Sequence, residues 1–421
     1  MTTYRSVKGM NDLFGAQAAG LIEVEQVVRR LAMAYGAQEV RTPILEHQEL
    51  FVRSVGEGTD IVGKEMYAFE DRDGSNLVLR PEATASVARM VVQHDLLRVD
   101  PKLRTFYAGP MFRRERPQKG RYRQFHQIGL ECFGEASPVA DIECIALAHA
   151  LLSALGLDDV IIELGNVGGP DTRPDYLELL RSYLHDCEDQ LPDGARETAR
   201  RNPLRLLDSK DSRVQDVLHD APLPMDHLND RHRAHHDAVY EGLVALGIDV
   251  HVNKRMVRGL DYYRGPIFEA LTQKLGAQAA VLAGGRYDGL LQTVGGPDVA
   301  AVGFAGGTER LLLVAQANGH ELGQVRPDLG VVAAPGADLH QILRLIIALR
   351  DTGCVVISDL SGRSVKAQMK AVNRKGCRYA LVLGETELES NAASLRRMAD
   401  GTDVNISLDL DNVRSVVMEV E

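Results

Sequence analysis

Apolar residues recur along the chain with two periods, and each period predicts a different kind of element. In residues 16–36 they fall three and four apart, which predicts an amphipathic helix that ends at Gly36. Residues 137–157 are almost all apolar and predict a second helix that ends near Gly156. A third helical pattern begins at Pro81, a residue suited to a first helical turn.

Shorter apolar runs between these helices predict strands. Residues 37–51 predict a strand interrupted at Pro43, and such a proline is usual in an edge or interface strand. Residues 66–69 and 77–79 predict two strands joined around the turn Asp73-Gly74. This part of the chain therefore combines strands and helices.

The second half of the chain changes character twice. Residues 168–250 are polar and helical in pattern, and we interpret them as a helical insertion. Strand-like sequence resumes at residues 251–316, and its last strand leads into a helix. After a polar linker, residues 328–421 alternate apolar strands with helices, which predicts a small α/β domain with a largely parallel sheet.

Composition places the chain among soluble globular proteins. Its 421 residues allow two or three domains, and it is 45% hydrophobic and 25% charged. Its five cysteines form no CxxC pair, so neither a disulfide framework nor a zinc site is indicated. No apolar run spans a bilayer, and the first residues lack the apolar core of a secretion signal, so we expect a cytoplasmic enzyme with no membrane partner.

A basic loop stands out against this acidic chain. Residues 104–134 predict a β-hairpin whose loop carries six cations, five of them Arg, within residues 113–123. The chain as a whole has a net charge of -11. Arg makes planar, two-pronged contacts with phosphate, so the loop favours a large anion over a simple solvated turn.

Other candidate sites are weaker when taken alone. The chain has no Walker loop, no HExxH motif and no GxSxG elbow. His232, His235 and His236 have metal-like spacing, but their polar surroundings favour a solvated helix face. Arg258 and Arg310 lie in apolar settings. A buried arginine needs an anionic partner, so we expect each either to form a buried ion pair or to bind, together with Arg113, one polyphosphate.

Three short motifs match the class II aminoacyl-tRNA synthetases: a proline at 43, FRRE at 112–115 and GTER at 307–310. Two longer segments are more specific, ERPQKGRYRQFHQ at 115–127 and RGLDYY at 258–263, and LRPEAT, GGRYDGLL and DLSGRSVKAQMK support them. Through these segments the chain resembles the histidyl-tRNA synthetase family over essentially its whole length. Ala83, Gly306 and the opening GMND depart from the family pattern without removing a charged or hydrogen-bonding group.

The resemblance implies an α+β fold with two domains. Residues 1–325 would form a class II catalytic domain with a central antiparallel sheet and the helical insertion at about 168–250. Residues 328–421 would form a C-terminal α/β anticodon-binding domain. The family implies a homodimer formed through the region around Pro43, which a proline-marked edge strand allows.

The resemblance also implies roles for individual residues. ATP, as its Mg2+ complex, would be bound by Arg113, Glu115, Arg121, Phe125 and Arg310. Histidine would be bound by Glu82, Thr84, Gln127, Glu131, Arg258, Tyr262 and Tyr263. Arg113 and Arg258 would act in catalysis, the tRNA would contact Arg116, Gln118 and Arg123, and no tightly bound metal is expected.

In this hypothesis Glu131 would determine the specificity for the amino acid. A neutral imidazole has one donor and one acceptor nitrogen, which a carboxylate at Glu131 and a hydroxyl at Tyr263 can satisfy. An isosteric amino acid would leave these groups unpaired, a difference that discriminates about 10⁴-fold without an editing domain. The product would be histidyl-tRNA(His), made through a histidyl-adenylate.

Three alternatives compete with this hypothesis. The histidine-sensing regulatory subunit of ATP phosphoribosyltransferase resembles this family, but it lacks the anticodon-binding domain and keeps the catalytic arginines poorly. An RNA-binding pseudo-synthetase would not need the intact set Glu82, Gln127, Glu131 and Tyr263. A different class II specificity is disfavoured by RGLDYY at 258–263.

Overall fold

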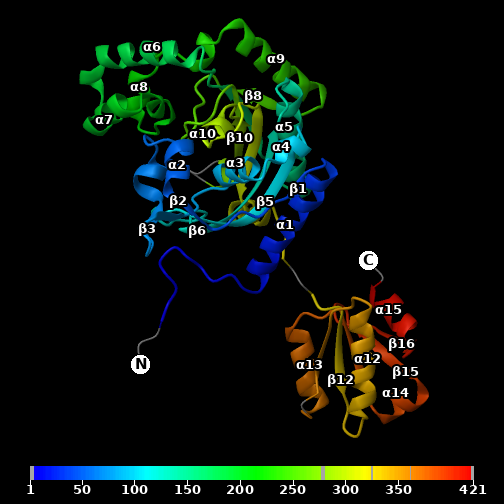
Figure 1. Ribbon diagram of the computed structural model, residues 1–421. Coiled ribbons are helices and arrows are strands. Elements are labelled where there is room, and N and C mark those ends of the chain that lie inside the picture. Colours follow the sequence, from blue (N-terminus) through cyan, green and yellow to red (C-terminus); the bar gives the residue numbers. More distant parts are fainter. Residues whose placement is uncertain (1–3, 276–279, 324–325, 361, 419–421) are drawn as a thin grey trace. The chain divides into compact units, whose positions relative to one another are not determined.

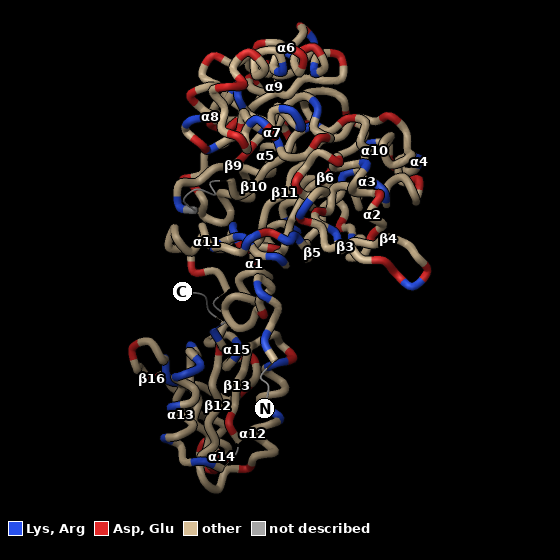
Figure 2. The backbone as a smooth tube through the Cα atoms, turned by 90° about the vertical axis from the view of Figure 1, so that its left-hand side faces the viewer, with Lys and Arg blue, Asp and Glu red and all other residues tan. Residues whose placement is uncertain are grey.

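The computed structural model describes residues 4–275, 280–323, 326–360 and 362–418. The chain forms two compact units, Met1–Gly323 and Gln324–Glu421 (Figure 1). Acidic and basic positions are interspersed in both units (Figure 2). No helix in the described ranges has the length and apolar content that crossing a membrane requires.

The first unit is built on an eight-stranded sheet. In spatial order its strands are β1 Gln38–Glu39, β5 Arg104–Phe112, β6 Gln124–Phe133, β11 Ala301–Gly307, β10 Ala280–Arg286, β9 Pro266–Leu271, β7 Ile161–Asn166 and β8 Val250–Val252. Neighbouring strands are antiparallel except at the two edges, where β1 runs parallel to β5 and β8 to β7. The expected central antiparallel sheet is confirmed, and β5 and β6 are the predicted hairpin.

Each face of this sheet carries its own hydrophobic core. Helices α1 Ala16–Ala34, α5 Pro138–Ala154 and α11 Thr308–Ala317 contribute to the core on one face. On the other face α2 Gln48–Val55, α3 Thr84–Gln93 and α10 Leu290–Thr293 pack over β5 and β6. The apolar α5 is buried along most of its length, as its sequence predicts.

A three-stranded sheet lies beside the large one in order β2-β4-β3, with β2 Leu45–His47, β3 Tyr67–Glu70 and β4 Asn76–Leu79. The predicted pair of strands at 66–79 is confirmed, and Asp73 accepts the Ser75 N–H in the turn at 2.9 Å. The single strand predicted over 37–51 is wrong, because β1 and β2 join different sheets and α2 follows at once. A π-helix, η1 Ile61–Glu65, and α4 Leu96–Val99 complete this region.

Residues 173–245 form a group of helices. Those up to residue 221 have a core of their own, built around Tyr176, Leu180 and Leu184, whereas Val239 and Leu243 join the core of the large sheet. The elements are α6 Arg173–Asp186, η2 Glu188–Gln190, α7 Asp193–Arg201, η3 Pro203–Asp208, α8 Ser212–Val217, η4 Pro224–His227 and α9 Asp230–Ala245. Residues 253–265, which were expected to continue the sheet, instead form a loop between β8 and β9. The short helix η5 Gln273–Leu275 follows β9.

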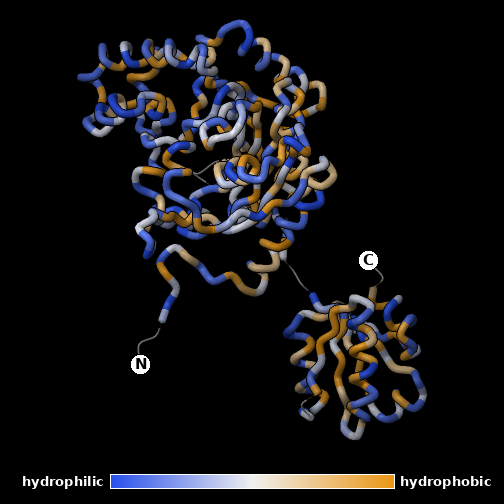
Figure 3. Tube along the Cα trace, viewed as in Figure 1, coloured by the Kyte–Doolittle hydropathy of each residue, from blue (hydrophilic) through white to orange (hydrophobic). Residues whose placement is uncertain are grey.

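The second unit has a five-stranded sheet in order β13-β12-β14-β15-β16. Its elements are β12 Leu329–Ala333, α12 Leu339–Asp351, β13 Val356–Asp359, α13 Val365–Arg374, β14 Tyr379–Leu383, α14 Glu385–Ser390, β15 Ala392–Arg397, β16 Asp403–Ser407 and α15 Leu410–Met418. The α/β character is confirmed, but only β13, β12 and β14 are parallel, because β15 and β16 form an antiparallel hairpin. Apolar strands lie inside this unit (Figure 3).

Candidate functional site

A cavity of about 700 Å³ opens on the first unit, where β6, β10 and β11 meet the loop that precedes β9. Residues of the helical segment 173–245 also reach it, through Arg205, Asp208 and Lys210. All the residues predicted to bind ATP or histidine line this cavity: Glu82, Thr84, Arg113, Glu115, Arg121, Phe125, Gln127, Glu131, Arg258, Tyr262, Tyr263 and Arg310. The fold therefore gathers positions 228 residues apart in sequence, from 82 to 310.

Strand β6 places the two central polar residues. Side chains alternate along a strand, so Gln127 and Glu131 lie on the same face, with Gly129 between them. A Cβ atom at Gly129 would lie 2.3 Å from the hydroxyl oxygen of Tyr107. That hydroxyl donates to Oε1 of Gln127 at 3.4 Å, so the glycine leaves room for a tyrosine that holds the glutamine.

Glu131 is held by two hydroxyl groups. Its side chain is 1% exposed, Oε1 accepts the Thr84 hydroxyl at 2.7 Å, and Oε2 accepts the Tyr287 hydroxyl. Burial raises the pKa of Glu131 to about 8, against the lowering effect of these hydrogen bonds. Each carboxyl oxygen keeps a lone pair for a ligand.

Gly303 makes this arrangement possible. It lies opposite Glu131 in the β6–β11 ladder. A Cβ atom at Gly303 would lie 2.2 Å from Oε2 of Glu131, 2.3 Å from the Leu130 carbonyl oxygen and 2.7 Å from the Tyr287 hydroxyl. Only a residue without a side chain allows the carboxyl group and the tyrosine to meet here.

A second acid lies close to Glu131. The side chain of Glu82 is 3% exposed and accepts the backbone N–H groups of Thr84 and Ala85 at 2.7 and 2.9 Å, where α3 begins. The positive end of a helix favours a carboxylate, whereas burial raises the pKa of Glu82. Two buried acids in one cavity favour a ligand that carries cationic or N–H groups.

Three arginines, Arg113, Arg121 and Arg310, also line the cavity. Arg113 donates from Nε to a backbone carbonyl at 2.8 Å, and its guanidinium lies 5.4 Å from the centroid of the Phe125 ring. Arg121 forms a 3.1 Å ion pair with Glu115. Burial, followed by repulsion from Arg121 and then Arg113, lowers the pKa of Arg310. This mutual repulsion favours an anion with several negative charges.

Arg258 is a further cation of the cavity. Its guanidinium forms an ion pair with Glu269 on β9 and lies 5.7 Å from the centroid of the Tyr263 ring. Its Nε atom is buried and has no hydrogen-bond partner among the described residues. Tyr262 and Tyr263 are both buried and pack together at 4.8 Å between ring centroids. Arg258 is thus a fixed cation with a donor left for a ligand.

Two residues to which the sequence assigned no role belong to the site. Tyr287 contacts Glu131 from the segment GGRYDGLL, which drew attention only through the resemblance. Glu309 accepts the backbone N–H of His126 at 2.9 Å and lies 2.8 Å from its ring nitrogen Nδ1. Burial lowers the pKa of His126, but bonding to Glu309 outweighs it and the net shift is upward. Neither contact joins residues close in sequence.

The residues predicted to contact tRNA lie outside the cavity. Arg116 and Gln118 are exposed in the loop between β5 and β6. Arg123 is half-buried and donates from Nε to the Glu115 carbonyl at 3.2 Å, while its own N–H bonds to the Gly9 carbonyl at 2.7 Å. The first two side chains are accessible to a large partner, whereas Arg123 also maintains the shape of the loop.

The sequence favoured a solvated helix face for the three histidines of α9, and this expectation is wrong. His236 is 4% exposed, His232 bonds to Asp171 at 2.8 Å, and His235 bonds to Asp141 at 2.9 Å. Each faces a different neighbour because α9 packs against both α5 and the loop after β7. Within the described ranges, no group of three or more His, Cys, Asp or Glu side chains is arranged to hold a metal ion.

Comparisons with known proteins agree over nearly the whole chain. The family model described as Histidyl-tRNA synthetase matches residues 9–171 and 185–311, and the model described as Anticodon binding domain matches residues 331–419. A histidine–tRNA ligase of Trichlorobacter lovleyi is 42% identical over 411 residues, which cover 98% of this chain and 97% of that protein. One of Nitrosomonas europaea is 43% identical over 407 residues, 96% of each chain.

Solved structures give the same result. The crystal structure of apo histidyl-tRNA synthetase from S. aureus aligns with a TM-score of 0.80 at 30% identity, covering 99% of both chains. A histidyl-tRNA synthetase from Nostoc aligns with a TM-score of 0.74 at 18% identity, which supports the fold.

Proposed function

Because the chain belongs to the histidyl-tRNA synthetase family, we propose that it joins histidine to tRNA(His) in two steps that consume ATP. The observation that carries this proposal is one cavity lined by the two buried acids Glu82 and Glu131 and by the arginines Arg113, Arg121 and Arg310. The acids suit the nitrogen groups of histidine, and the arginines suit a triphosphate.

The first step forms histidyl-adenylate. A carboxylate oxygen of histidine attacks the α-phosphorus of ATP, and the bond from that phosphorus to the pyrophosphate oxygen breaks. The carboxylate is already ionised at neutral pH, so no general base is required. Arg113 and Arg258 stabilise the charge that builds on the phosphoryl oxygens, and both are held by other protein groups before substrate arrives.

The rest of ATP is bound beside these groups. The adenine stacks on Phe125, the aromatic ring against which Arg113 already lies. Arg121 and Arg310 hold the outer phosphates together with the Mg2+ that accompanies ATP as substrate. Glu115 orients Arg121 through their 3.1 Å ion pair.

Histidine is recognised at both of its ends. Its α-ammonium group is bound by Glu82, Thr84 and Gln127, and its imidazole by Glu131 and Tyr263, with Tyr262 packed behind. The Thr84 hydroxyl bonds to Glu131, so the two subsites share one hydrogen-bond network. An amino acid without the ring N–H leaves a lone pair of the Glu131 carboxyl group without a donor, which disfavours its adenylate.

The second step transfers the histidyl group to the 3′-terminal adenosine of tRNA. Arg116, Gln118 and Arg123 contact the acceptor end. A neighbouring cavity of about 660 Å³ shares Arg205 and Arg258 with the first and adds Lys64 and Arg213, alongside the acids Asp60, Asp208 and Asp211. The second unit reads the anticodon, and Arg363 and Lys366 near the start of α13 are candidate contacts.

Assembly and location follow the family. We propose a homodimer formed around β1 and β2, since Ile44 and Leu45 are 42% and 45% exposed beside Pro43. Light scattering after size exclusion measures its mass, and a mass of 46.1 kDa for the particle would exclude the dimer. The enzyme acts in the cytoplasm.

The regulatory-subunit alternative is less supported. A protein described as an ATP phosphoribosyltransferase regulatory subunit/histidyl-tRNA synthetase from Bacillus halodurans is 23% identical with a TM-score of 0.65, which speaks for the fold alone. The second unit and the presence of Arg113, Arg258 and Arg310 favour a charging enzyme.

Histidine-dependent exchange of pyrophosphate into ATP tests the proposal. The purified, folded protein should catalyse exchange with histidine and with no other amino acid at a comparable rate. Absence of exchange with histidine, in a preparation whose folding is confirmed by circular dichroism, would overturn the enzymatic function. A histidine-binding signal without exchange would favour the regulatory subunit.

A further inference from the structure

A buried ion pair lies directly behind the histidine subsite. Arg286 is the last residue of β10 and is 4% exposed, and Asp141 in the first turn of α5 is 1% exposed. Nε of Arg286 lies 3.2 Å from both carboxylate oxygens of Asp141, and Nη2 lies 2.5 Å from Oδ2. No part of the proposed chemistry uses either group.

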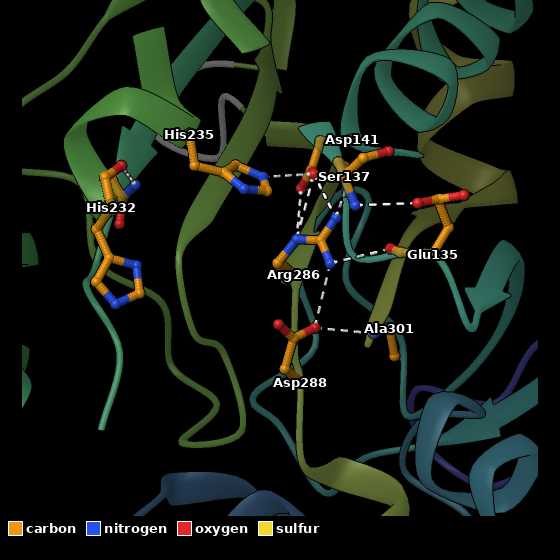
Figure 4. Close-up of polar contacts among 9 residues, drawn as sticks. Glu135, Ser137, Asp141, His232, His235, Arg286, Asp288 and Ala301 are labelled. Carbon is orange, nitrogen blue, oxygen red and sulfur yellow. Dashed lines mark hydrogen bonds and ion pairs between the residues drawn. The ribbon is translucent and has the colours of Figure 1, made fainter. Parts of the chain in front are cut away.

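The guanidinium is bound on every side (Figure 4). It also donates to the backbone carbonyls of Glu135 and Ser137 at 3.2 and 3.3 Å, and to Asp288 at 3.3 Å. Asp288 in turn accepts the Ala301 N–H at 2.9 Å, at the start of β11. Arg286 therefore connects β10, β11 and the segment that enters α5.

Tyr287 lies within this set of contacts around Arg286, which we call the clamp. The residues on both sides of it, Arg286 and Asp288, are held by the network, and its own N–H bonds to the Ala301 carbonyl at 2.8 Å. Its hydroxyl reaches Glu131, the proposed imidazole-binding acid. A shift of the Arg286 backbone would therefore move the Tyr287 hydroxyl and the carboxyl group that it orients.

Stability alone gives little reason for such a pair. Removing two charges from water is costly, and an apolar pair of the same volume is often equally stable or more so. A fully bonded guanidinium does restrict the backbone, because its planar fork requires several acceptors in fixed directions.

We propose that Arg286 and Asp141 are positioning residues that fix Tyr287, and through it Glu131, for discrimination of the imidazole ring. His235 extends this network of contacts to the helical segment 173–245. Its Nε2 lies 2.9 Å from Oδ2 of Asp141, the oxygen that Arg286 also contacts (Figure 4). Docking of α9 therefore contributes to the geometry of the histidine subsite.

This inference rests on the proposed function, so the wild-type exchange reaction is measured first. The principal variant is the double substitution Arg286→Met with Asp141→Leu, which removes both charges and keeps similar volume. His235→Gln tests the link to α9 separately. The matched control is Arg104→Met with Glu143→Leu, because this ion pair also joins a strand of the sheet to α5 but is not part of the clamp.

Each protein is assayed for KM with histidine, KM with ATP and use of β-(4-thiazolyl)alanine, whose ring keeps an acceptor nitrogen but has no N–H. In the principal variant we expect the histidine KM to rise about tenfold to a hundredfold, since small misplacement of reacting groups has effects of that order. Preference for histidine over the analogue should fall by a similar factor, with the ATP KM changed less than about twofold. His235→Gln should show the same pattern with a smaller effect.

A purely structural pair would instead lower the unfolding temperature and reduce all rates together. The proposal is overturned if the principal variant keeps the wild-type KM and preference for histidine. If that variant does not fold, Asp141→Asn replaces it, and an unchanged histidine KM in this milder variant also overturns the proposal. Failure of wild-type exchange would reject the proposed function itself, so the two failures are distinguishable.

Discussion

Glu131→Gln tests whether the proposed histidine subsite holds an uncharged carboxyl group before substrate binds. Burial raises the pKa of Glu131 from 4.5 to about 8. Between these values the folded chain binds a proton that the unfolded chain has lost. The stabilising effect of this proton is therefore complete below about pH 4.5 and is lost as the pH rises through about 8.

The size of the effect follows from the shift. One pKa unit corresponds to about 1.4 kcal/mol, so raising the pH from 5 to 8 should destabilise the wild type by about 3 to 4 kcal/mol relative to the variant. Unfolding entropy of about 2 cal/mol/K per residue, over the unit Met1–Gly323, converts this into about 5 °C. The glutamine can accept one hydroxyl proton and donate to the other hydroxyl, so the variant should fold.

The assay is thermal unfolding at half-unit steps from pH 5 to 8.5, without histidine or ATP. The unfolding temperature of Glu131→Gln should rise relative to the wild type as the pH increases. Glu70→Gln is the control, because Glu70 is an exposed acid on β3. A difference that is the same at pH 5 and pH 8 would refute the reasoning and show that Glu131 is ionised throughout.

Three further predictions concern activity. Arg258→Ala should lower the exchange kcat about 100-fold or more while the Kd for histidine changes much less, because the guanidinium acts on the developing phosphoryl charge; exchange near the wild-type rate would make Arg258 structural. Gly303→Ala places a methyl group 2.2 Å from Oε2 of Glu131, so the histidine KM in the same assay should rise about tenfold, and an unchanged value would contradict the predicted clash. Arg116→Ala should leave exchange unchanged but weaken tRNA charging several-fold and reduce its salt dependence, as expected for a phosphate contact; equal loss in both reactions would argue against that assignment.

The sequence predicted the elements well where a single period continues for many residues. The helices at 16–36 and 137–157 and the hairpin at 104–134 are such cases. It failed at 37–51, because a few extended residues carry no signal for which sheet they join. In the second unit the pattern of apolar strands did not distinguish the antiparallel pair β15–β16 from a parallel pair.

The candidate site shows the same limit at the level of side chains. Charged residues in apolar settings, such as Arg258 and Arg310, could be selected from the sequence, and the cavity contains both. Tyr287 and Asp141 could not, because their importance depends on contacts with residues more than 100 positions away. The α9 histidines were misjudged since a polar sequence does not reveal a packing partner such as α5.

The glycines around Glu131 bear on the engineering of this protein toward larger amino acids. Gly129 and Gly303 have no side chain to shorten, so no substitution at these positions can enlarge the pocket. New volume must come from the tyrosines that fill the spaces the glycines leave, Tyr107 and Tyr287. Each of these rings also supports a polar residue of the pocket, so a bulkier substrate would be admitted only with weaker selection for histidine.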